Sequence, residues 1–298
     1  MVTFFTVFIS AALAAAKVTI QGEVSRRILR NSADRYYFNG LLFAFIVLIL
    51  LLYGGIPSAS AETVMLAALG GACSVLFQAS YVAALASGPV SLTVVLNNLG
   101  ISLVMLYEAF VYDASITNIQ ILGSALLVVS MIMCISKNDF KQKIRIHWVF
   151  TVFVCMAFNG ILAILASVHQ HTDVKQETSQ FVLYQYIFAA LISFFLYFLI
   201  KQRNVGIKKA LTSRGRSFDL NVLSVGGALT AAMLLCIFQI SNLYIIRVVN
   251  PMILYPLRTG LNSLMMTLVG IFIFRDKLSV WQYIGIALGV ASAVTLNM

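Results

Sequence analysis

Apolar residues run along the chain in long blocks that short polar segments interrupt, and this pattern predicts membrane-spanning helices. A helix needs about 20 apolar residues to cross the hydrocarbon core of a bilayer. Windows of that kind recur ten times, over residues 2–20, 36–53, 63–86, 90–112, 117–135, 148–168, 181–200, 220–245, 250–274 and 279–297. We therefore predict an all-α integral membrane protein with ten transmembrane helices.

The second half of the chain repeats the first. A shift of 162 positions places identical residues on each other, including Pro89 and Pro251, Gln120 and Gln282, Gly123 and Gly285, and Ser130 and Ser292. Further matches have shifts of 161 at Phe77–Ser80 and 145 at Phe5–Phe8. Five helices per copy is an odd number, so the second copy enters the membrane from the opposite side. The pattern predicts two inverted five-helix repeats, 1–135 and 148–298, joined by a cytoplasmic loop, 136–147.

Composition and charge support a membrane location. Hydrophobic residues make up 61% of the chain and charged residues 10%, which excludes a soluble fold of this length. The net charge of +10 does not indicate nucleic acid, because the basic residues lie in short loops between spans. Odd-numbered loops hold most of them, with Lys17, Arg26, Arg27, Arg30 and Arg35 in the first. By the positive-inside rule the odd loops are cytoplasmic and both termini face outward across a plasma or inner membrane.

For several side chains at the ends of spans, the sequence predicts a location but no catalytic or binding role. The basic segment Gln21–Arg35 is a solvated loop or a helical extension of the first span. His169 and His171 are expected in a solvated outer loop, and Trp148 and Trp281 at the membrane interface. The four cysteines fall inside predicted spans and are expected to pack there. No cofactor, metal site or disulfide is predicted.

One motif carries a resemblance to a known family. Phe274–Gly285 resembles the Gly-Glu-x-Leu-Ser-x-x-Gln-x-x-Gly stretch of the drug/metabolite transporter superfamily in its ten-span EamA-like form, and Asp113–Gly123 is the counterpart in the first half. Arg275 stands where the family often has Gly, Asp276 replaces Glu, and Ala114 lacks the acid. The resemblance implies a central cavity between spans 1, 3, 4, 6, 8 and 9. Within that cavity it favours Asn159, Gln78 and Gln239.

Two ionised side chains fall well inside predicted spans. At 1.5 Å per residue, Glu108 lies about 6 Å and Arg258 about 10 Å below the outer face. Charges inside a bilayer are costly, so both are candidates for function. We expect them to line the outer half of the cavity and to pair when it holds no substrate. A purely structural ion pair between the halves is the alternative. Glu108 is also the candidate for proton coupling.

Polar residues near these charges complete the predicted substrate site. Tyr255 and Asn262 share a helix face with Arg258, and a guanidinium beside a phenol and an amide suits a carboxylate or phosphate. The other candidates come from four predicted spans: Asn97, Asn98, Gln78, Tyr81, Gln239 and Asn159. Bonding between helices is the alternative role for the amides.

These observations favour a secondary transporter that moves a small polar metabolite by alternating access, with proton-coupled export as one mode. An amino acid or organic anion is the favoured substrate. The alternative is a quaternary amine held by Glu108, Tyr81, Tyr107 and Tyr255. A membrane enzyme is disfavoured, because Asp139, Asp219 and His147 show no catalytic spacing. A receptor or channel is a third class. Apart from its substrate and the lipid bilayer no partner is predicted, and the oligomeric state is left open.

Overall fold

The fold is helical throughout the part of the chain that the structure describes. The computed structural model describes residues 2–29, 31–55, 58–112, 117–134, 146–210, 225–237, 265–266, 268–275 and 278–296, and no strand occurs among them. This confirms the all-α class. Within these described residues, four helical segments are long and apolar enough to cross a membrane: Ser32–Gly54, Ala61–Ser87, Ile146–Gln170 and Lys175–Gln202.

The helices follow the predicted blocks in chain order. They are α1 (Val2–Arg27), α2 (Ser32–Gly54), α3 (Ala61–Ser87), α4 (Val90–Asn98), the 3₁₀ turn η1 (Leu99–Ile101), α5 (Ser102–Val111), α6 (Asn118–Cys134), α8 (Ile146–Gln170), the 3₁₀ turn η2 (Lys175–Glu177), α9 (Thr178–Ala210) and α12 (Val280–Leu296). A shorter apolar helix spans Val225–Ile237.

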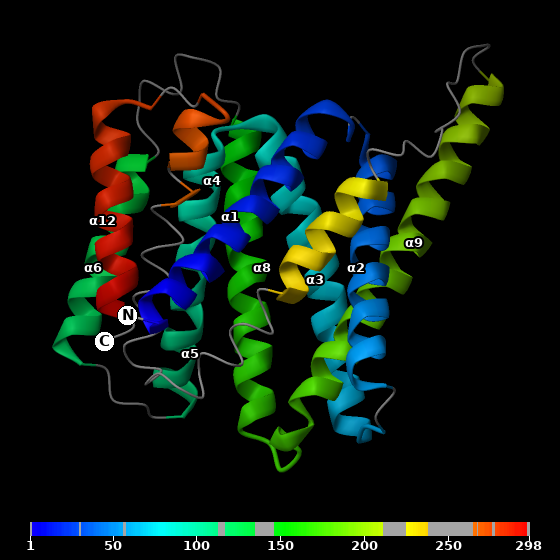
Figure 1. Ribbon diagram of the computed structural model, residues 1–298, viewed down its shortest axis with the longest axis horizontal. Coiled ribbons are helices and arrows are strands. Elements are labelled where there is room, and N and C mark those ends of the chain that lie inside the picture. Colours follow the sequence, from blue (N-terminus) through cyan, green and yellow to red (C-terminus); the bar gives the residue numbers. More distant parts are fainter. Residues whose placement is uncertain are drawn as a thin grey trace.

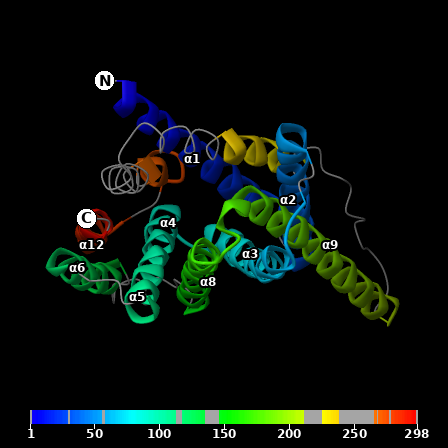
Figure 2. The same cartoon turned by 90° about the horizontal axis from the view of Figure 1, so that it is seen from below.

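The helices pack as an elongated bundle. Figure 1 shows α1 running obliquely across the more upright α3 and α8. Seen from below in Figure 2, α6 and α12 lie together at one end of the molecule, and α2 and α9 lie at the other. Between them α3 packs against both α8 and α9. This arrangement places α1, α3, α4 and α8 at the centre.

The α6–α12 pair is held by two reciprocal hydrogen bonds. Ser130 Oγ on α6 donates to the Gly285 carbonyl at 2.7 Å, and Ser292 Oγ on α12 donates to the Gly123 carbonyl at 2.8 Å. Each serine lies late in its own helix and bonds a glycine early in the other. The two helices are therefore antiparallel, and their contact is self-complementary, as in a two-fold interface.

Three apolar clusters surround the centre of the bundle. The α2/α9 cluster includes Leu42, Val75, Ala189 and Ala231. The α1/α8 cluster includes Val18, Tyr81, Val90 and Cys155. The α1/α2 cluster includes Val24, Phe38, Val82 and Ala228. The helix α3 contributes residues to all three clusters. The α3 residues that lie between these contributions are therefore where the clusters meet.

Large apolar side chains also cover the outside of the bundle. Leu52 on α2, Phe150 on α8 and Phe195 on α9 are 80%, 67% and 62% exposed. A surface of this kind suits contact with lipid tails and would be unfavourable in water. It agrees with the four apolar helices in indicating a membrane-embedded protein.

Two predicted features of the first half differ in the structure. The first helix does not end near residue 20 but runs unbroken to Arg27, so the helical alternative for the basic segment is the one observed. Lys17, predicted in a loop, is therefore inside α1. The predicted span over 90–112 is not one regular helix, because the 3₁₀ turn η1 separates α4 from α5. The helix begins at the predicted place, with Pro89 as its N-cap.

Trp148, predicted at the membrane interface, lies at the start of α8 and is covered by other parts of the protein. Its side chain is 1% exposed, and its indole Nε1 donates to Thr93 Oγ1 at 3.2 Å. The nearby Gly88 makes room for it, since a Cβ there would lie 2.2 Å from Nε1. Trp281, by contrast, is 63% exposed, as an interfacial residue would be.

Candidate functional site

Two predicted substrate residues, Asn97 and Asn159, bond to each other's helices. Asn159 Nδ2 on α8 donates to the Asn97 backbone carbonyl at 2.9 Å, and Cys155 Sγ donates to Asn97 Oδ1 at 3.3 Å. Asn97 is 8% exposed. These contacts satisfy polar groups at the α4–α8 crossing, so the structure favours the helix-bonding role for this pair. Asn98 follows as the last residue of α4.

The α4–α8 crossing coincides with the break between α4 and α5. A Cβ on Gly100 would lie 2.4 Å from the Met156 carbonyl, and one on Gly160 would lie 2.7 Å from the Gly100 carbonyl. Only glycines allow the two backbones to approach this closely. A 3₁₀ turn inside a helix often marks a hinge, because its hydrogen bonds are weaker than those of an α-helix. The sequence did not predict this break.

Gln78 and Tyr81 on α3 lie in different surroundings. Tyr81 is 4% exposed, packs in the α1/α8 cluster and stacks on Phe77 with ring centroids 5.7 Å apart. Gln78 is 3% exposed, and its buried Nε2 has no hydrogen-bond partner. Along α3 it lies between Val75 of the α2/α9 cluster and Val82 of the α1/α2 cluster. Of these two predicted residues, Gln78 is the one with unused hydrogen-bonding capacity.

Two further amides share this property. Gln21 on α1 and Asn39 on α2 are both 0% exposed, and both amide atoms of each lack a hydrogen-bond partner. Sequence reasoning missed Gln21 because it was assigned to a loop. The detectable signal is the buried stripe of α1, since Gln21 is three residues after Val18 and three before Val24. Asn39 lies next to Phe38 on α2.

We call Gln21, Asn39 and Gln78 the polar junction, because each lies between residues of the apolar clusters. Gln21 lies between the α1/α8 and α1/α2 clusters, and Asn39 between the α1/α2 and α2/α9 clusters. A buried polar atom without a partner costs about 1 to 3 kcal/mol. Five such atoms would cost about 5 to 15 kcal/mol if nothing bonded them, as much as the whole stability of many proteins. The junction therefore needs polar partners from water or a ligand.

A charged residue lies one helical turn from the junction. Lys17 is four residues before Gln21 on α1, so the two side chains share a helix face. Lys17 is partly buried, while the adjacent Ala16, about 100° around the helix, is exposed. No carboxylate pairs with Lys17 among the residues that the structure describes. The cation and the three neutral amides lie on α1, α2 and α3, and both α1 and α2 pack against α3.

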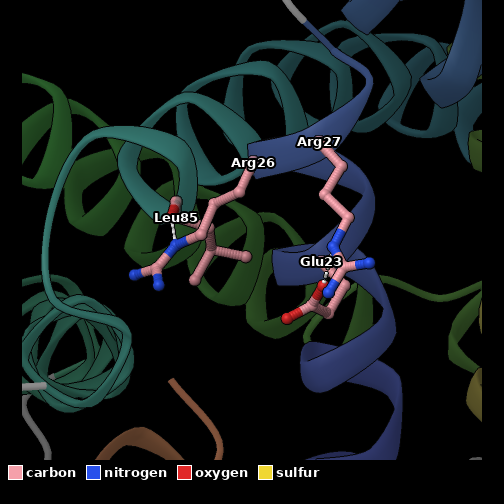
Figure 3. A network of polar contacts seen from close by, with 4 residues as sticks. All are labelled: Glu23, Arg26, Arg27 and Leu85. Carbon is pink, nitrogen blue, oxygen red and sulfur yellow. Dashed lines mark hydrogen bonds and ion pairs between the residues drawn. The ribbon is translucent and has the colours of Figure 1, made fainter. Parts of the chain in front are cut away.

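Arg26 anchors the end of α1 on other helices. Its Nε donates to the Leu85 carbonyl at 3.1 Å and its Nη2 to the Gly88 carbonyl at 3.0 Å, at the C-terminus of α3. Its guanidinium also lies over the Phe274 ring, 4.7 Å from the centroid. Figure 3 shows Arg26 beside Leu85, and Arg27 paired with Glu23 on the same helix. A cation here complements the negative end of the α3 dipole.

The predicted solvated loop after α8 contains a buried polar cluster instead. His169 is 0% exposed, stacks on Phe181 at 4.8 Å and has Nε2 3.3 Å from Thr63 Oγ1. Glu177 Oε2 accepts from the backbone N and the Oγ of Ser60 at 2.9 Å each, at the N-terminus of α3. The prediction for His169 was wrong because three helix ends meet over it. His171 is exposed and stacks on Tyr112, with centroids 3.7 Å apart.

The remaining predicted site residues cannot be placed against this geometry. Glu108 lies on α5, but its side chain is outside the described residues. Four more predicted residues are also outside them: Gln239, Tyr255, Arg258 and Asn262. The predicted pairing of Glu108 with Arg258 stays a prediction. Within the described residues, no group of three or more His, Cys, Asp or Glu side chains could hold a metal ion.

Comparison with solved structures identifies a similar fold. No known protein family and no curated protein matches the sequence. A solved structure described only as "Crystal structure of protein" aligns with 99% of this chain and 97% of its own, at a TM-score of 0.57 and 12% identity. At that identity the likeness shows a shared overall fold and says nothing about activity.

Proposed function

We propose that this protein is a secondary transporter of the ten-span EamA-like kind, which moves a small polar metabolite across a cell membrane by alternating access. The observation that carries the proposal is the reciprocal bonding of α6 and α12. Ser130 and Ser292, and Gly123 and Gly285, are the positions that the shift of 162 places on each other. Two-fold bonding between antiparallel copies is what an inverted repeat predicts, and such repeats are common in secondary transporters.

A second pair of contacts supports the same symmetry. Arg26 lies over Phe274, and His171 stacks on Tyr112. The shift of 145 relates Arg26 to His171, and the shift of 162 relates Tyr112 to Phe274. The C-terminal ends of α1 and α8, where these contacts lie, are at opposite ends of the bundle (Figure 1). Each end of the bundle thus has an equivalent contact.

These paired contacts give alternating access a physical basis. In this mechanism the contact at one face opens while its counterpart at the other face stays closed, so solute in the centre reaches one side at a time. The 3₁₀ turn η1 and the glycine contact between Gly100 and Gly160 supply a hinge between the moving helices. Coupling to protons through Glu108 stays a prediction.

The test combines flux with sided labelling. Purified protein in liposomes is screened for uptake of amino acids, organic anions and quaternary amines. In a background with the four cysteines replaced by alanine, Tyr112→Cys and Phe274→Cys are then labelled separately with a membrane-impermeant maleimide. The transported solute should raise labelling at one position and lower it at the other.

A cross-link provides the control. In that background, Tyr112→Cys combined with His171→Cys should stop uptake when oxidised and restore it when reduced, because the two rings are in contact. If the maleimide reaches Tyr112→Cys and Phe274→Cys equally well under conditions where solute is transported, both faces are open at once and the protein is a channel. Absence of uptake for every solute class would remove the carrier proposal and leave a receptor or enzyme.

A further inference from the structure

Lys17 lies at a depth where a cation is unusual. It is nine residues before Arg26 on an unbroken helix, and Arg26 bonds the carbonyls that end α3. At 1.5 Å per residue, Lys17 is about 13 Å from that end of the helix. Because α1 crosses the bundle obliquely (Figure 1), the depth of Lys17 below that end is smaller than this length along the helix, but it lies inside a hydrocarbon core that is about 30 Å thick. Ionisable residues at such depth generally line a substrate pathway or contact a partner.

Among the residues that the structure describes, polar groups surround Lys17 and no carboxylate pairs with it. Lys17 shares its face of α1 with Gln21, which is 0% exposed, and the adjacent Val18 is 8% exposed. α1 packs against α3, where Gln78 is 3% exposed. Both amide atoms of Gln21 and the Nε2 of Gln78 have no hydrogen-bond partner. Lys17, Gln21 and Gln78 therefore provide one ammonium group, two amide NH₂ groups without an acceptor and one amide oxygen without a donor.

We propose that Lys17, Gln21 and Gln78 form the binding site for a small carboxylate that also carries a hydroxyl or amino group. The ammonium and the two amide NH₂ groups bind the carboxylate oxygens, and Gln21 Oε1 accepts from the hydroxyl or amino group. The inference rests on the proposed function, because it names the substrate class of that carrier. It places a recognition residue on the first helix, in addition to the predicted Arg258.

Replacing Gln21 by an apolar residue should change the melting temperature in opposite directions for a ligand-binding role and for a structural role. Gln21→Leu replaces two unpartnered buried atoms with an apolar side chain of similar size, so the ligand-free protein should melt at a higher temperature. If Gln21 only supported packing between helices, the same change would lower the melting temperature. This opposite sign separates a ligand-binding role from a structural one without any measurement of activity.

The experiment is a thermal-shift titration of the purified full chain in detergent with lactate and malate, each beside its neutral amide, lactamide or malamide. At least one carboxylate should stabilise the wild type while its amide does not. Lys17→Gln should weaken the binding of that carboxylate by about tenfold or more, because a hydrogen bond to a charged group is lost. Lys201→Gln is the matched control, since Lys201 Nζ contacts Tyr197 Oη near the far end of α9.

Each outcome decides the inference. It is overturned if neither carboxylate stabilises the wild type, if Lys17→Gln binds as the wild type does, or if Gln21→Leu melts lower and still binds normally. Uptake of the same carboxylate into liposomes separates this failure from that of the proposed function. Binding without uptake would overturn the carrier and keep the site. Uptake that Lys17→Gln leaves unchanged would keep the carrier and overturn the site.

Discussion

The reciprocal bonds between α6 and α12 predict that two distant substitutions have equal effects. Ser130→Ala and Ser292→Ala each remove one buried hydrogen bond, 2.7 Å and 2.8 Å long, from the hydroxyl of a 0% exposed serine to a glycine carbonyl. Each should cost about 0.5 to 1.5 kcal/mol. The two bonds are seven residues apart on each helix, which is about 10 Å, so the double variant should show the sum.

The assay is thermal unfolding of the purified protein in detergent, where 1 kcal/mol corresponds to about 2 to 4 °C in a chain of this size. Ser87→Ala is the matched control, because the Ser87 hydroxyl is exposed and bonds only Ala83 in its own helix. The control should melt as the wild type does. Clearly unequal losses for Ser130 and Ser292, or a loss as large in the control, would refute the two-fold contact and with it the main support for an inverted repeat.

A steric test of the same contact uses Gly289. A Cβ on Gly289 would lie 2.8 Å from Ser130 Oγ and 3.1 Å from Val95 Cγ1. The hydrogen bond from Ser130 Oγ to the Gly285 carbonyl holds the Ser130 hydroxyl in place. Gly289→Ala should therefore destabilise the protein more in the wild type than in a Ser130→Ala background. Equal costs in both backgrounds would mean that the hydroxyl does not occupy this position.

Three other substitutions test separate parts of the structure. Gly88→Ala should cost about 1 to 3 kcal/mol, seen as a lower melting temperature, because the new methyl group overlaps the Trp148 indole. Asn159→Leu should lower the melting temperature, because the hydrogen bond to the Asn97 carbonyl is lost, and should leave the KM for uptake unchanged. A raised KM would instead mean that Asn159 contacts the substrate. Glu177→Leu should melt at a lower temperature than Glu177→Gln, which keeps an acceptor oxygen for the start of α3.

The sequence alone predicted the helices whose apolar blocks are uninterrupted. The blocks over 36–53, 63–86 and 148–168 correspond to α2, α3 and α8 within a few residues. These boundaries follow from hydropathy, since a helix in lipid must satisfy its backbone internally over the whole apolar length. The reciprocal α6–α12 bonds also join residues that the shift of 162 had paired, although only the fold brings them together.

Only the tertiary structure decided which polar residues have partners. Asn97 and Gln78 look alike as amides within apolar blocks, yet Asn97 is bonded across α8 and Gln78 Nε2 is not bonded. Lys17 and His169 look like loop residues, because a local charge or imidazole next to a span end indicates solvent. Their burial depends on how far α1 continues and on which helix ends meet over α8, and both follow from packing between segments far apart in the chain.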